Sequence, residues 1–148
     1  MRRTMILQGL RGLSALLMGA ALLGAGLPAW ADDGLVLIGN APLKGVNAEA
    51  IRRIYAGRVV EIDGTALRPV NLASGLGLRQ RFFDTVLQQS EADYVAYWTV
   101  RRYIGKGAPP AELRSSAEVI DYVGRTPGAL GYIDATDLRP GLHVLWRR

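Results

Sequence analysis

The sequence of 148 residues contains no cysteine and only one histidine, His143. Without cysteine the chain forms no disulfide bonds, and thiolate catalysis and thiolate metal sites are excluded. The acidic residues are scattered singly along the chain, so we expect no metal and no cofactor. The sequence also lacks a GxGxxG motif and a P-loop lysine. Nucleotide binding therefore has no support.

Residues for nucleophilic catalysis are equally scarce. Ser74 lacks the glycine two positions before it that a nucleophile elbow requires. His143 is far from Ser74 in the sequence and could pair with Asp134 or Asp137, but a lone histidine in a strand pattern is more often structural. The sequence indicates that the protein is not an enzyme, and catalysis by Ser74 and His143 is the weaker alternative.

The N-terminal segment has the pattern of a secretory signal. Arg2 and Arg3 form a basic start, residues 12–27 are uncharged, and Ala29-Trp30-Ala31 has the small-x-small pattern of a cleavage site. This uncharged run is short for a membrane span, which needs about 20 residues. We therefore predict a signal peptide over residues 1–31 and one domain over residues 32–148, in a periplasmic or secreted location with no stable membrane span after cleavage. An uncleaved anchor is the alternative, and Sec or twin-arginine export stays open.

Little net charge remains once the signal is removed. The whole chain carries a net charge of +5, but residues 32–148 contain 15 basic and 13 acidic residues, a net charge of +2. Nucleic acid is therefore not an expected partner. Aromatic residues around Tyr97 and Trp98 alternate with Arg101 and Arg102, a spacing that favours a helix with a buried face and a solvated face over a base-stacking surface.

The first half of this domain shows clear element signals. Leu35–Ile38 is typical of a buried strand. Asn47 is a good N-cap for a helix that runs through Tyr55 and ends at Gly57. Asp63-Gly64 between two apolar runs predicts a hairpin. Pro69 confines the second of these strands to an edge or to an irregular end.

The second half alternates helices and strands. A helix is predicted from Leu76 to about Gln89, and another after Ser90 with Tyr97, Val100 and Ile104 on its buried face. Further along the chain are a helix that begins at a Ser115-x-x-Glu118 capping box, a strand over Ala129–Ile133 and a closing strand over Leu142–Trp146. The predicted fold class is α/β, with a mixed sheet of about four or five strands and about four helices.

The segment from Asn71 to Phe83, NLASGLGLRQRFF, contains the best candidate binding site. A glycine-rich loop that opens a helix leaves backbone N–H groups unpaired beside the positive end of the helix dipole, which suits an oxyanion. The candidate ligand-binding residues are Ser74, Gly75, Gly77 and Arg79, the last as a charged donor. A plain helix start with Ser74 as the N-cap is the alternative.

Several motifs follow one another in a specific order. They are Ile38-Gly39-Asn40, Ile54-Tyr55-Ala56-Gly57, Asp63-Gly64, Ser74-Gly75 before Phe82, Tyr97-Trp98, Gly105-x-Gly107 and Thr126-Pro127-Gly128-Ala129-Leu130-Gly131-Tyr132. In this order the chain resembles phosphate-binding proteins of ABC transporters, and in particular the small periplasmic-binding-protein-like members of that family. The resemblance implies a single lobe of a type II periplasmic-binding-protein-like fold.

The resemblance also implies a ligand, phosphate or a similar oxyanion. In the family a Ser-Gly-Thr segment binds phosphate oxygens; Ser74 and Gly75 match it, Leu76 lacks the third hydroxyl, and Arg79 loosely matches a basic residue. Full members are two-lobed clamps, so one lobe implies weak binding unless an envelope protein partner or a homodimer closes the site. We expect an exported, non-enzymatic solute-binding-type domain of transport-protein descent. The alternative is a periplasmic protein-interaction or sensory module that has lost ligand binding.

Overall fold

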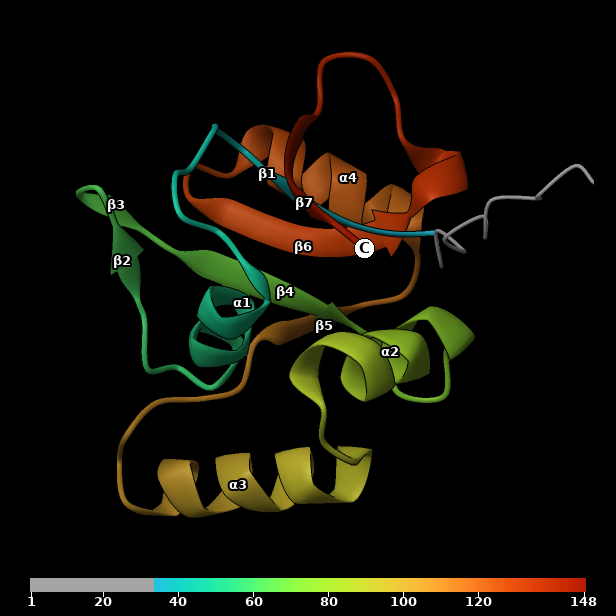
Figure 1. The fold of residues 1–148 in the computed structure, drawn as a ribbon. Coiled ribbons are helices and arrows are strands. Elements are labelled where there is room, and N and C mark those ends of the chain that lie inside the picture. The colour runs from blue at the N-terminus through green and yellow to red at the C-terminus, as the bar shows by residue number, and fades with distance from the viewer. Residues whose placement is uncertain (1–33) are drawn as a thin grey trace, which may run out of the picture. The chain divides into compact units, whose positions relative to one another are not determined.

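The computed structural model describes residues 34–148, which form a five-stranded mixed sheet with four α-helices (Figure 1). The predicted signal peptide, residues 1–31, lies outside the described residues. Within residues 34–148 no helix combines the length and apolar character needed to cross a bilayer. The elements are β1 (Leu35–Gly39), α1 (Ala48–Tyr55), β2 (Glu61–Ile62), β3 (Thr65–Ala66), β4 (Arg68–Leu72), α2 (Gly77–Phe82), the π-helical turn η1 (Phe83–Leu87), α3 (Glu91–Tyr103), β5 (Ala111–Leu113), α4 (Ser116–Arg125), β6 (Ala129–Asp134), the 3₁₀ turn η2 (Ala135–Asp137) and β7 (His143–Arg147).

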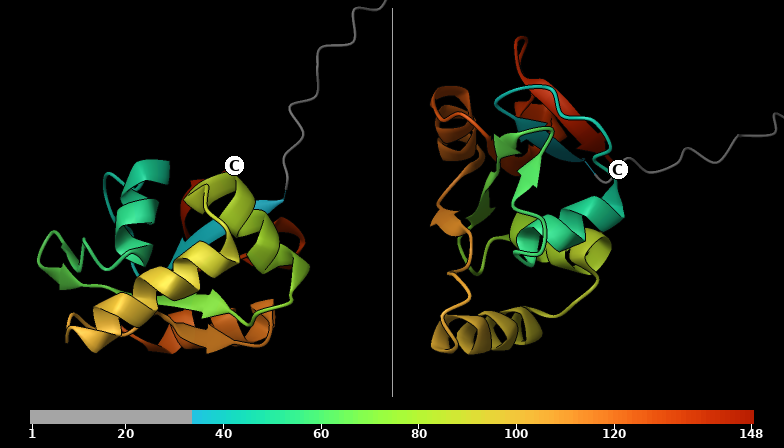
Figure 2. Two further views of the ribbon diagram at one scale, coloured as in Figure 1. Left: turned by 90° about the horizontal axis from the view of Figure 1, so that it is seen from below. Right: turned by 90° about the vertical axis from the view of Figure 1, so that its left-hand side faces the viewer.

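The sheet has the order β5-β4-β6-β1-β7. Strand β4 runs parallel to β5 and β6, whereas β1 runs antiparallel to β6 and β7. Helix α4 covers one face of the sheet and helices α1 and α2 cover the other, as the right-hand view of Figure 2 shows. Every residue of β1 is buried because this interior strand is covered on both faces. The predicted α/β class with a mixed sheet of about five strands and four helices is confirmed.

Helix α1 begins and ends where its sequence predicts. The Asn47 side chain accepts a hydrogen bond from the backbone N–H of Ala50 at 2.8 Å, which pairs one of the first-turn donors. Gly57 follows the helix with a φ of +64°, the left-handed conformation that glycine adopts at little cost. The buried face consists of Ile51, Ile54 and Tyr55.

The Asp63-Gly64 hairpin is also present and pairs β2 with β3. Asp63 and Gly64 both have positive φ, 50° and 76°, as a two-residue hairpin turn of the primed type requires. Strand β4 is not an edge strand, because β5 and β6 flank it. Pro69 is tolerated at its start, where β4 pairs with β6 only and pairing with β5 begins at Val70. Of the two predicted alternatives, an edge strand or an irregular strand end at Pro69, the structure has the irregular end.

Helix α3 buries a different face from the predicted one. Tyr94 and Trp98 are buried, whereas Val100 and Ile104 are 60% and 55% exposed. The Tyr94 ring packs on Phe83, with 4.9 Å between ring centroids. Aromatic packing against η1 fixes the orientation of α3. The predicted buried face is wrong for Val100 and Ile104, whereas Tyr97 is half-buried against the core.

Candidate functional site

The glycine-rich loop lies between β4 and α2, at the end of an interior strand. Its residues from Ser74 to Gly77 are exposed. Gly75 has a φ of +87°, and a Cβ added at Gly75 or Gly77 would meet no atom within 4 Å. The backbone of this loop is therefore open to a molecule approaching from solvent.

The helix that follows the loop has no side-chain cap. Its N-cap residue is Leu76, whose side chain has no oxygen to accept a hydrogen bond. The alternative that Ser74 is the N-cap is therefore wrong. The first backbone hydrogen bond of the helix runs from the N–H of Gln80 to the carbonyl of Leu76, at 3.1 Å. Among residues 34–148 the N–H groups of Gly77, Leu78 and Arg79 have no hydrogen-bond acceptor. These unpaired donors stand at the positive end of the helical segment formed by α2 and η1.

Arg79 lies in the first turn of α2 but its side chain is only 2% exposed. Its Nη2 is 2.9 Å from Oε1 of Glu91, and its Nη1 is 2.7 Å from Oε1 of Glu112. Nη1 also donates to the backbone carbonyl of Leu72, and the guanidinium carbon lies 4.8 Å from the centroid of the Phe83 ring. The Arg79 guanidinium thus ties together α2, α3, β4 and β5.

Glu91 connects the predicted residues to one another. Partial burial would raise the pKa of its carboxyl, but hydrogen bonds from the Ser74 hydroxyl and from Arg79, together with the Arg79 charge, outweigh this and lower the pKa. Ser74 and Arg79 are therefore brought together on one carboxylate of the chain itself. Glu91 is the first residue of α3 and was not among the predicted site residues.

A shallow pocket of about 310 Å³ adjoins the loop. Gly75 and Leu76 form one side of it, and Ser90 and Glu91 form part of the other. Asp84 adds a second carboxylate, and no basic side chain lines the pocket. Backbone amides are thus the main positive groups that a ligand in this pocket would meet.

A buried polar network lies behind the loop. The Tyr132 hydroxyl donates to the side-chain oxygen of Asn71, and the N–H of Leu72 donates to the same two side chains. The Tyr132 ring stacks on Phe82 with 3.9 Å between centroids. This network fixes the last residues of β4 and hence the direction in which the chain enters the loop.

The two candidate catalytic residues are not linked by any contact within residues 34–148. Ser74 bonds to Glu91, whereas His143 is exposed at the start of β7, an edge strand. No hydrogen bond or ion pair involving the His143 side chain occurs within the part of the chain that the structure describes. Ser74 and His143 are therefore not placed as a catalytic pair within residues 34–148.

Comparison with known proteins gives matches among solved structures alone. No protein-family model matches the sequence, and no curated protein matches it. An ABC-type phosphate transport receptor from Vibrio cholerae matches with a TM-score of 0.59 and 17% identity, over 76% of this chain and 45% of the receptor. A putative phosphate ABC transporter substrate-binding protein with bound phosphate from Clostridium perfringens matches with a TM-score of 0.58 and 20% identity, over 76% and 44% of the two chains.

A third similar structure is PstS from Borrelia burgdorferi, with a TM-score of 0.54 and 18% identity over 76% of this chain and 46% of PstS. The chain therefore spans less than half the length of the structures that it matches. At these identities the likeness establishes the fold and leaves the ligand open. The described part of this chain has the periplasmic-binding-protein-like α/β fold found in phosphate ABC transporter substrate-binding proteins.

Proposed function

We propose that this chain is an exported solute-binding-type domain, processed to residues 32–148, that binds phosphate or a similar small oxyanion. The binding residues are Ser74, Gly75 and Gly77, with Arg79 as the supporting cation. The observation that carries the proposal is the uncapped helix start, whose N–H groups are unpaired and which opens to solvent at Gly77. Such a group of backbone donors attracts anions through hydrogen bonding and through the helix dipole.

The role of Arg79 in this proposal is to hold the loop and to supply charge from behind it. Its guanidinium already bonds to the Leu72 carbonyl at the end of β4, and one of its nitrogens reaches Glu91 beside Ser74. In the ligand-free chain the Glu91 carboxylate accepts hydrogen bonds from the Ser74 hydroxyl and the Arg79 guanidinium, two donors that a phosphate oxygen would otherwise use. A bound oxyanion would share or displace this carboxylate.

The same carboxylate weakens binding. Glu91 and Asp84 both line the pocket beside the loop, and a phosphate must approach these negative charges. The loop is also open to water, where each charge-assisted hydrogen bond contributes only about 1.5–3 kcal/mol. We therefore expect a dissociation constant for phosphate of roughly 1 mM, equivalent to about 4 kcal/mol of binding free energy.

Isothermal titration of the purified protein with phosphate tests the proposal. Glu91→Gln removes a negative charge and leaves Arg79 less neutralised, so phosphate should bind about three- to tenfold more tightly. Ser74→Ala removes a hydroxyl from the exposed loop and should weaken binding about threefold. Glu61→Gln, on the exposed β2–β3 hairpin, is the control and should bind as the wild type does. Absence of heat for the wild type and for Glu91→Gln at millimolar phosphate would contradict the proposal.

A second candidate function is a protein-interaction or sensory module that no longer binds a ligand. The exposed apolar side chains of α3 favour it, because Val95, Val100, Tyr103 and Ile104 are 52% to 91% exposed. The neutralisation of Arg79 by two carboxylates is also consistent with a lost ligand. Co-purification from the cell envelope distinguishes the two candidates. A stoichiometric partner that stays bound with or without phosphate supports the module, whereas a lone monomer that binds phosphate supports the solute-binding domain.

A further inference from the structure

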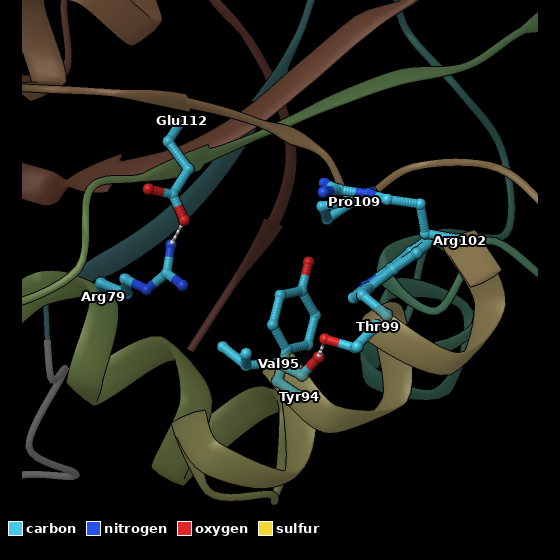
Figure 3. Close-up of a pocket in the computed structure, with 8 residues that line it drawn as sticks. Arg79, Tyr94, Val95, Thr99, Arg102, Pro109 and Glu112 are labelled. Carbon is cyan, nitrogen blue, oxygen red and sulfur yellow. Dashed lines mark hydrogen bonds and ion pairs between the residues drawn. The ribbon is translucent and has the colours of Figure 1, made fainter.

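A separate cavity of about 180 Å³ lies between α2, α3 and the segment that leads into β5 (Figure 3). It shares no lining residue with the pocket beside the Ser74 loop. Arg79, Tyr94 and Trp98 form its buried part, and Arg102 and Glu112 stand at its exposed part. Of the residues that line this cavity, the phosphate proposal uses only Arg79.

The buried part of the cavity presents polar atoms that lack partners. Tyr94 and Trp98 are 3% and 5% exposed, and the Tyr94 hydroxyl oxygen faces two donors, the Trp98 indole N–H and the Asn71 side-chain amide. Within residues 34–148 the Tyr94 hydroxyl has no acceptor for its own proton. The Nε of Arg79 is likewise buried without an acceptor. In Figure 3 the Tyr94 hydroxyl points into the space between Glu112 and Arg102. Buried polar groups are nearly always paired, so the Tyr94 hydroxyl proton and the Arg79 Nε indicate a missing acceptor.

The exposed part of the cavity carries one charge of each sign on opposite sides. Arg102 projects from α3, and Glu112 projects from β5, with Tyr94 between them (Figure 3). Arg102 has no ion pair with another residue of the described chain. Glu112 uses Oε1 to bind Arg79, its side chain is 49% exposed, and no described residue donates to its Oε2.

These charges discriminate between classes of small ligand. A simple carboxylate near Arg102 would be repelled by Glu112, and a simple amine near Glu112 would be repelled by Arg102. A molecule that carries both groups satisfies both sides and also supplies an acceptor for the Tyr94 hydroxyl. Val95 and Pro109 add apolar walls, and the small volume leaves room for only a short side chain.

We propose that this cavity binds a small zwitterionic α-amino acid. The ligand carboxylate faces Arg102 together with the Tyr94 hydroxyl. The ligand ammonium faces the second carboxylate oxygen of Glu112. The proposal is independent of phosphate binding at the Ser74 loop.

Calorimetric titration of the purified protein with glycine and with alanine tests the ligand class. Both should bind saturably with a dissociation constant of about 1 mM or lower, whereas acetate and methylamine should give no saturable heat at about 10 mM. Absence of binding by both amino acids at that concentration would overturn the proposal and would indicate that only water fills the cavity. Binding of acetate as tight as that of glycine would overturn it as well.

Three variants locate the binding site. Arg102→Gln should weaken alanine binding at least about tenfold, and Tyr94→Phe should weaken it about threefold. Arg139→Gln removes an exposed arginine outside the cavity and should bind alanine as the wild type does. Equal binding by Arg102→Gln and Arg139→Gln would overturn the proposal. Phosphate titrations with Ser74→Ala and Arg102→Gln separate the two proposals, because only the first substitution should change phosphate binding.

Discussion

At the scale of single residues, the position of Arg79 shows how a charge can be enclosed in a small domain. The guanidinium is 2% exposed and contacts two carboxylates, one carbonyl and one aromatic ring. A buried charge is tolerated when paired and hydrogen-bonded in this way, and removing one partner leaves the others uncompensated. Arg79 therefore acts as a structural centre whatever ligand the loop binds.

Substitution of Arg79 by methionine, which has a similar length but no charge, tests this structural role. We expect the free energy of unfolding to fall by about 2–3 kcal/mol, below the usual range for a fully buried pair because Glu91 and Glu112 are partly exposed and regain water. Urea unfolding measures the change, with Arg53→Met on the exposed face of α1 as the matched control. Equal stability of the two variants would contradict the structural role.

Three buried tyrosines determine how stability depends on alkaline pH. Burial raises the pKa of Tyr94 to about 12 and also raises the pKa values of Tyr55 and Tyr132 above the ordinary tyrosine value of about 10. Because the folded values lie above the unfolded ones, the unfolded state loses its protons first as the pH rises. The stability contribution is therefore fully present below pH 10 and is lost above it.

Urea unfolding at several pH values tests this dependence. The free energy of unfolding should stay level up to about pH 9 and fall steeply above about pH 10. The tyrosinate absorbance that comes from the three buried tyrosines should rise in step with unfolding, since their hydroxyls ionise only when exposed. Tyr94→Phe should make the fall less steep. A stability that stays constant up to about pH 12 would contradict the burial of these hydroxyls.

The burial of Arg79 could have been predicted from spacing. Arg79 lies on the same helical face as Phe82, Phe83 and Val86, all of which are buried. The sequence suggested a ligand contact instead, because arginine is rarely enclosed and its partners Glu91 and Glu112 are 12 and 33 positions away. Only the folded arrangement brings those two carboxylates to α2.

At the scale of elements, the junction between α4 and β6 leaves less room for a Cβ than any other glycine position in residues 34–148. Gly128 has a φ of +76°, and a Cβ added there would lie 2.0 Å from the carbonyl oxygen of Ala66. The N–H of Arg68 donates to the Gly128 carbonyl at 2.9 Å, which ties the junction to the start of β4. The first glycine of the Thr-Pro-Gly-Ala-Leu-Gly-Tyr motif is therefore required for steric reasons, because any side chain there would clash with the backbone of Ala66.

Alanine at position 128 should lower the free energy of unfolding by about 3 kcal/mol or more, because it combines a disfavoured φ with a backbone clash. Gly124→Ala is the matched control. Gly124 lies within α4 and a Cβ there would meet nothing within 4 Å, so alanine should raise stability by about 0.5–1 kcal/mol. Thermal unfolding of both variants measures the contrast, and a Gly128→Ala variant as stable as the wild type would contradict it.

The sequence predicted those elements whose signals are local. The Asn47 cap, the Asp63-Gly64 turn and the Ser90 cap each depend on neighbouring residues, and each forms as expected. Strand β5 has no local signal, since its three residues become a strand only by pairing with β4. The orientation of α3 could not be predicted from the sequence, because two of its faces carry apolar residues. Contacts with Phe83 determine which of the two faces is buried.

At the scale of the whole molecule, the chain corresponds to less than half of each solved structure that it resembles. A ligand at the Ser74 loop therefore remains in contact with water unless a second protein or a second copy covers it. This arrangement favours weak and rapidly reversible binding. A closed site would strengthen every hydrogen bond to the anion by excluding water.

The central claim is that the unpaired amides at the start of α2 bind an oxyanion. Nuclear magnetic resonance measures it directly, by following backbone amide shifts of the purified protein during a phosphate titration at constant pH and ionic strength. We predict saturable shifts that are largest at Gly75, Gly77 and Leu78 and that have one common dissociation constant of roughly 1 mM. Unchanged shifts at these residues, or larger shifts elsewhere in the chain, would contradict the claim.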